Sequence, residues 1–170
     1  MKRSGRTLKQ RLQDIAHLPS YLSRARYFRG HGVHSPFVYD IVRKVFMESK
    51  LHTADNALYG ALMDKSVAKR RAVQLANLAE HCGYDNWCID RLEDKRMIIA
   101  TLDTPYTELE RYAEYARQRG ATLCILYPYN NRERWDTCLR IIDRHPSTTV
   151  DNRAYLLVFN NHLPKQRFRL

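Results

Sequence analysis

The first half of the chain carries apolar residues at helical spacing. One stripe lies close to the start of the chain and is formed by Leu8, Leu12, Ile15 and Ala16. Lysine, arginine and glutamine fill the other side, and Pro19 follows, so the pattern predicts a short basic amphipathic helix. Such a helix either packs against its own domain or lies on a membrane surface.

Further helices are expected before residue 84. Ser35 and Pro36 form an N-cap and first-residue pair, and the apolar repeat that follows predicts a helix to about residue 49. The stretch 55–63 predicts a helical turn or two. Ser66 is then expected to cap a longer helix, which Gly83 stops.

The second half of the chain alternates strands with helices. Strands are expected over 86–90, 97–102 and 121–127, and a closing hairpin is expected to join 148–150 to 154–159. Thr104–Pro105 opens one intervening helix, which Gly120 closes. Asn130 or Asn131 caps the next, whose apolar repeat is Trp135, Cys138, Leu139 and Ile142. This alternation favours an α/β fold with a mostly parallel sheet, to which the hairpin adds one antiparallel strand.

Length and composition fit one compact domain. The 170 residues are 44% hydrophobic, enough for a sizeable core, and no apolar run approaches the length of a membrane helix. We expect a basic helical region, 1–83, to pack on an α/β unit, 84–170. The four cysteines match neither a metal knuckle nor a secreted disulfide scaffold, and no signal-peptide core follows the start. Reduced thiols and a cytoplasmic location are therefore expected.

The positive charge is concentrated in three places, the last of which is formed by Lys165, Arg167 and Arg169 near the end of the sequence. The whole chain carries a formal +11, and residues 1–30 hold eight basic side chains against Asp14 alone, a formal +7. A second cluster consists of Lys65, Lys69, Arg70 and Arg71. Basic segments attract polyanions, so RNA, DNA or an anionic membrane surface are admissible partners. A solvated basic surface is the alternative, because no zinc finger, RNP-like strand or Gly-x-x-Gly loop accompanies the charge.

Several segments resemble one enzyme family. The string His31-Gly32-Val33-His34-Ser35-Pro36-Phe37 is similar to an N-terminal extension found in uncharacterised class I methyltransferases that depend on S-adenosylmethionine (SAM). Residues 97–103 resemble the fourth strand of these enzymes, 121–129 the fifth, and 148–159 the closing strand pair. The resemblance covers about two thirds of the chain and implies an incomplete Rossmann-like sheet.

The cofactor-binding part of that family has no room in this chain. In such enzymes a glycine-rich loop after strand one and an acidic residue after strand two hold SAM. Only 13 residues separate Gly83 from Met97, whereas one βαβ unit takes about 30. We therefore expect a methyltransferase-like protein that lacks the SAM-binding half, is not catalytic, and acts by binding a protein partner or an anionic ligand. The alternatives are a methyltransferase whose SAM site is completed in a homodimer, and an RNA- or DNA-binding module.

The candidate ligand-binding residues are few. His31, Gly32, His34 and Ser35 lie in or next to a loop before a helix N-terminus, where free N–H groups favour an anion. Asp103 matches an acidic residue that often follows strand four in the family, although capping the helix after Thr104–Pro105 is the simpler role for it. No catalytic, cofactor-binding or metal-ligating residue is expected.

Overall fold

The computed structural model describes residues 34–170. The amphipathic stretch 8–16, His31 and Gly32 lie outside the described residues. The described helices are α3 (Pro36–Ile41), the π-helix η2 (Val42–Phe46) that continues it, α4 (Ala57–Asp64), α5 (Lys69–Cys82), the 3₁₀-helix η3 (Tyr106–Glu108), α6 (Leu109–Arg119) and α7 (Arg132–Arg144). The strands are β1 (Trp87–Ile89), β2 (Met97–Ala100), β3 (Thr122–Leu126), β4 (Thr149–Asp151), β5 (Tyr155–Val158) and β6 (Arg167–Arg169).

The six strands form one mixed sheet in the order β1-β2-β3-β5-β4-β6. β1, β2 and β3 pair in parallel, β5 runs antiparallel to both β3 and β4, and β6 is parallel to β4. Five strands therefore share one direction and β5 alone opposes them. The expected α/β fold, with a mostly parallel sheet and one antiparallel strand from a hairpin, is confirmed.

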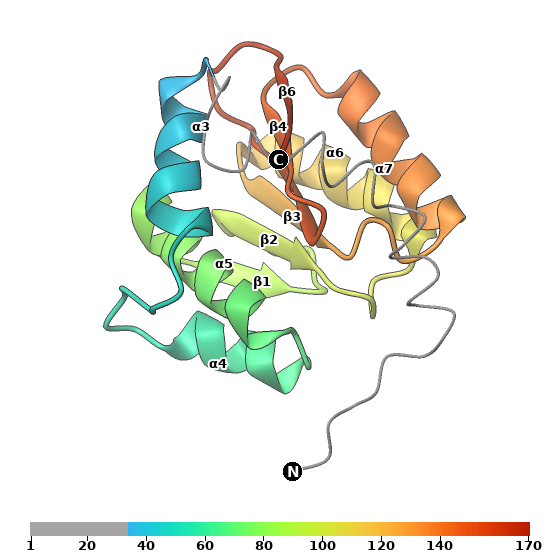
Figure 1. Ribbon diagram of the computed structural model, residues 1–170. Helices are drawn as coiled ribbons and strands as arrows, with labels where there is room; N and C mark the ends of the chain where they lie inside the picture. The colour runs from blue at the N-terminus through green and yellow to red at the C-terminus, as the bar shows by residue number, and fades with distance from the viewer. Residues whose placement is uncertain (1–33) are drawn as a thin grey trace, which may run out of the picture.

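Helices cover both faces of the sheet (Figure 1). One face packs on α3, η2, α4 and α5, around fully buried side chains such as Ile41, Leu62 and Leu75. The other face packs on α6 and α7, around Leu109, Leu123 and Ile125. Because both faces are buried, the middle strands are continuously apolar, as in other sheets of this kind.

Parallel strands β1 and β2 are joined without a helix. Seven residues, 90–96, connect Ile89 to Met97, whereas parallel neighbours usually need a dozen or more. The short connection is possible because β1 has only three residues, so the chain has about 10 Å to return. Leu92 of this connection packs on the α6–α7 side of the sheet.

Several expected helix ends are confirmed. The Ser35 hydroxyl accepts a hydrogen bond from the Val38 N–H at the start of α3, with Pro36 as the first residue. The Asn131 side chain caps α7 in the same way. Gly83 and Gly120 follow α5 and α6 with φ of 66° and 63°, a conformation that glycine adopts without a Cβ penalty.

The prediction that Ser66 caps α5 is wrong. Ser66 instead ends α4, at a φ of 57°. Its N–H donates to the Met63 carbonyl, and the next N–H, of Val67, donates to the Leu62 carbonyl. These two bonds form a Schellman ending, and the buried Val67 side chain supplies the hydrophobic contact typical of it. Helix α5 therefore starts later, at Lys69, without a side-chain cap.

The strand β6 was not expected from the sequence. It pairs with β4 beyond the hairpin, and Leu170 after it is buried in the core. Its exposed arginines flank one partly buried phenylalanine, so its pattern is too short to distinguish it from a loop. Within the described part of the chain, no helix combines the length and the apolar character that crossing a membrane requires.

Candidate functional site at the carboxyl edge of the sheet

The carboxyl ends of β1, β2 and β3 meet at one edge of the sheet, where open α/β sheets bind their ligands. The first residue after β1 is Asp90, and the first residue after β3 is Tyr127. Both have a positive φ, of 54° and 52°. Non-glycine residues adopt this conformation at an energetic cost, so surrounding contacts must hold the backbone there.

The Asp90 carboxylate lies at the centre of a polar cluster. Its Oδ1 accepts from the Thr101 N–H at 2.7 Å and from the Thr104 hydroxyl at 2.7 Å, and its Oδ2 accepts from the Thr101 hydroxyl at 2.8 Å. The Lys65 ammonium lies 3.2 Å from Oδ2. Only 12% of the Asp90 side chain is exposed. We call Lys65, Asp90, Thr101, Asp103 and Thr104 the Asp90 cluster.

Asp103 belongs to this cluster through Lys65. The Lys65 Nζ donates to Asp103 Oδ2 at 2.8 Å, so one ammonium bridges two carboxylates. The expected role of Asp103 as a helix cap is therefore wrong. The helical segment begins three residues later, at Tyr106, and the Asp103 side chain is 66% exposed where it meets Lys65.

Arg134 fixes the ends of β2 and β3 from the first turn of α7. Its Nη1 donates to the Thr104 carbonyl at 2.9 Å, and its Nη2 donates to the carbonyls of Thr101 at 2.8 Å and Leu126 at 3.1 Å. The residue is 3% exposed, and its Nε has no hydrogen-bond partner among the described residues. Burial lowers the pKa of the guanidinium, but arginine keeps its proton in proteins. The result is a buried cation that binds backbone carbonyls.

The Asp90 cluster is not set up for proton transfer. Burial acts to raise the pKa of Asp90, but hydrogen bonds from Thr104, Thr101 and Lys65 outweigh it and hold the pKa below the ordinary 3.8. Hydrogen bonds to Asp103 and Asp90 raise the pKa of the Lys65 ammonium. At neutral pH the carboxylate and the ammonium are therefore both charged, and neither group suits a general base or a nucleophilic amine.

The four thiols are also unsuited to nucleophilic chemistry. Burial raises the pKa of Cys82 to about 11 and that of Cys138 to about 12, and it raises the pKa of Cys88 and Cys124 as well. All four are free thiols, and at neutral pH they are protonated. Cys124 and Cys138 lie in the two halves of the core, as the sequence predicts.

The described candidate residues from the sequence do not form one site. His34 is exposed, and Ser35 is buried with its hydroxyl engaged in capping α3. Helix α3 meets the opposite edge of the sheet from Asp103, because Phe37 packs against Phe159, which follows the antiparallel strand β5. His31 and Gly32 lie outside the described residues.

Sequence reasoning missed the residues that build the carboxyl edge. Asp90 directly follows a strand, which is a recognisable position, but its partners Thr101 and Lys65 come from distant elements. Arg134 gives no signal in the sequence, because the apolar repeat Trp135, Cys138, Leu139 and Ile142 predicts a different buried face for this helix. The buried face is rotated from this and includes Arg134, Thr137, Cys138, Ile141 and Ile142.

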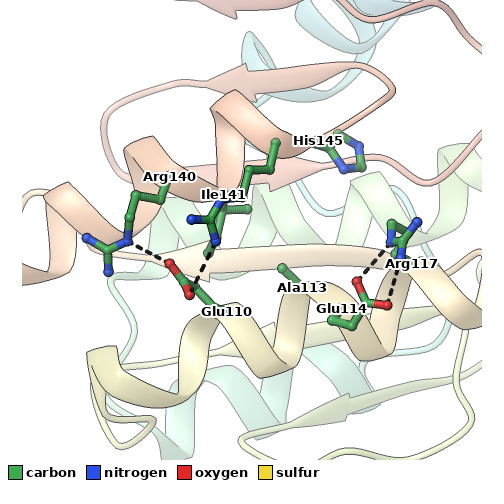
Figure 2. Close-up of a pocket in the computed structure, with 8 residues that line it drawn as sticks. Glu110, Ala113, Glu114, Arg117, Arg140, Ile141 and His145 are labelled. Carbon is green, nitrogen blue, oxygen red and sulfur yellow. Dashed lines mark hydrogen bonds and ion pairs between the residues drawn. The ribbon is translucent and has the colours of Figure 1, made fainter.

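A second polar feature lies on the outer helix layer. A groove of about 290 Å³ runs between α6 and α7, and Figure 2 shows the charged side chains along it. Arg140 Nε lies 2.6 Å from Glu110 Oε1, and Arg117 makes two hydrogen bonds to Glu114. His145 lies at the end of the groove, where α7 ends.

Comparisons with protein-family models, with curated proteins and with solved structures found no match to this chain. The fold and the geometry described above therefore carry the functional argument.

Proposed function

We propose that the chain is a shortened relative of the class I SAM-dependent methyltransferases that binds an anionic ligand and transfers no methyl group. The observation that carries this proposal is the Asp90 cluster, which fills the sheet edge where such an enzyme holds its cofactor. The order of elements supports the relationship. The strands that resemble the fourth and fifth strands of the family, β2 and β3, are parallel neighbours, and the strand pair that resembles the closing one follows beside them.

The residues at this edge do not fit SAM. A cofactor loop after β1 needs glycine and a helix N-terminus. Here Asp90 and six further residues connect β1 to β2, and this connection contains no helix. The described glycines, Gly60, Gly83 and Gly120, all lie in or after helices. The Thr101 N–H and the Asp90 oxygens, which would have to contact a nucleotide, already bond to one another.

The charge on α5 supports the anionic ligand. Its first three residues are Lys69, Arg70 and Arg71, with no acidic residue in the first turn and no side-chain cap. The helix macrodipole places positive potential at this end, so three cations there are unfavourable unless an anion offsets them. Lys69 and Arg70 are exposed and accessible. The formal +7 in residues 1–30 adds to the attraction for a polyanion.

Fluorescence anisotropy of a labelled mixed-sequence RNA tests the proposal on the full chain, with labelled polyglutamate as a second polyanion. We expect binding at about 50 mM salt that weakens steeply by about 200 mM, because counterions are released. The double substitution Lys69→Gln/Arg70→Gln is expected to weaken binding more than the matched control Arg111→Gln/Arg132→Gln. The proposal fails if neither polyanion binds at low salt, or if the two double variants behave alike.

A further inference from the structure

The groove between α6 and α7 combines a buried histidine with arginines that reach solvent. Ala113 and Ile141 lie between the polar side chains that line it, which include Glu110, Arg117 and His145 (Figure 2). Arg144 also lines the groove. With three arginines against two glutamates, the groove lining carries a formal +1. Its volume, about 290 Å³, suits a small ligand rather than a nucleotide.

His145 presents a hydrogen-bond acceptor to this groove. The residue is 6% exposed, and its Nε2 lies 2.7 Å from the Phe159 carbonyl oxygen. A carbonyl can only accept, so Nε2 carries the hydrogen and Nδ1 of the neutral ring is an acceptor. Burial lowers the pKa of His145, with Lys165 and Arg117 adding to the effect, so the ring is neutral at pH 7. Among the described residues, none donates to Nδ1.

Arg144 supplies hydrogen-bond donors to the same groove. Its Nη1 lies 3.8 Å from Glu110 Oε2, beyond hydrogen-bond distance, while Arg140 holds the other oxygen of that carboxylate at 2.6 Å. Arg144 is 74% exposed and directly precedes His145 in the chain. The groove lining therefore offers both a guanidinium and a neutral imidazole acceptor.

We propose that this groove binds the phosphate group of a small phosphate monoester in its singly protonated form. Guanidinium groups bind phosphate oxygens through paired hydrogen bonds, which Arg144 can supply, while Arg117, paired with Glu114, adds positive charge. The remaining P–OH donates to His145 Nδ1. A carboxylate or a sulfate satisfies the arginines equally well but brings no proton for the imidazole, so the histidine selects phosphate. The site is separate from the first turn of α5, and either can fail without the other.

The site is tested by titrating the full chain with inorganic phosphate and with O-phosphoserine near pH 6.5, while the nitrogen resonances of the His145 ring are followed. We expect a saturable shift at Nδ1 with both ligands, and weaker binding of sulfate. Arg144→Gln is expected to weaken phosphate binding about tenfold. The matched control Arg132→Gln, an exposed arginine in the first turn of the same helix, leaves binding unchanged.

Glu110→Gln separates a binding site from a purely structural role. It removes the carboxylate that competes for Arg140 and Arg144, so phosphate is expected to bind several-fold more tightly. The alternative is that the arginines only offset the negative C-terminal ends of α6 and α7. The proposal is overturned, and the alternative holds, if the nitrogen resonances of His145 do not shift at phosphate concentrations up to about 20 mM. The same conclusion follows if sulfate binds as tightly as phosphate, or if Glu110→Gln does not strengthen phosphate binding.

Discussion

The Asp90 cluster and the α6–α7 groove both gather charged side chains, but they use them differently. At the carboxyl edge, the Asp90 side chain is only 12% exposed and its oxygens bond to groups from other elements. In the groove, the ion pairs join helix residues whose side chains are about half exposed. Buried polar contacts hold a structure together, whereas exposed ones contribute little stability and remain available to a ligand. The edge at which open α/β sheets usually bind their ligands is therefore occupied here by structural contacts.

The largest effect is expected from Arg134→Ala. The substitution leaves three carbonyls at the ends of β2 and β3 without their donor and opens space beneath α7. We expect the free energy of unfolding to fall by about 3 kcal/mol, measured by urea denaturation. Arg132→Ala, on the exposed side of the same turn, is the control and is expected to change it by less than about 0.5 kcal/mol. Equal losses in the two variants contradict the role given to Arg134.

Asp90→Ala tests the centre of the cluster. It removes an acceptor of three hydrogen bonds and leaves Thr101 and Thr104 without their partner, so a loss of about 2–3 kcal/mol is expected. Asp103→Ala is the matched control, because Asp103 pairs with the same lysine but is 66% exposed. Its loss is expected to be smaller. If the two aspartates contribute equally, the distinction between buried and bridging carboxylates is wrong.

The pH dependence of stability isolates the Asp90 carboxylate. Since its pKa is lowered in the folded state, the unfolded chain takes up this proton first as the pH falls. The stability that Asp90 contributes is therefore present above about pH 4 and is lost as the pH falls further. In Asp90→Asn, the free energy of unfolding should not show this loss as the pH falls below about 4. The lowered pKa values of Asp40 and Glu114 affect both proteins alike. Parallel profiles down to about pH 3 contradict the account.

The smallest effect is expected in the groove. Glu110→Gln breaks the ion pairs to Arg140 and Arg144, all of which are at least 40% exposed. We expect the free energy of unfolding to change by less than about 0.5 kcal/mol in urea denaturation. A loss as large as that of Asp90→Ala means that the groove, too, is structural.

Much of the fold follows from the sequence because the second half has clear periodicity. The apolar strand that ends before Tyr127, the bounds of the two helices that flank it and the Gly120 stop lie close to where the structure has them. Local signals were ambiguous where one residue suits two roles. Ser66 reads equally well as the cap of α5 and as the end of α4, and the burial of Val67 decides in favour of α4.

The candidate site was harder to predict because its contacts are long-range. Lys65 and Asp103 are 38 residues apart, and Thr104 and Arg134 are 30 apart, so no local pattern links them. An arginine in a predicted helix is also ordinarily assigned to the face that is exposed to solvent. The burial of Arg134 follows only from the positions of the strand ends around it.

The central claim is that the Asp90 cluster closes the edge where the class I methyltransferases, of which we propose this chain is a shortened relative, bind their cofactor. Isothermal titration calorimetry of the full chain with SAM, repeated at several protein concentrations, tests it most directly. The account predicts no saturable heat at any concentration. Saturable binding in the micromolar range contradicts it, and binding that strengthens with protein concentration points instead to a cofactor site completed by a second copy of the chain.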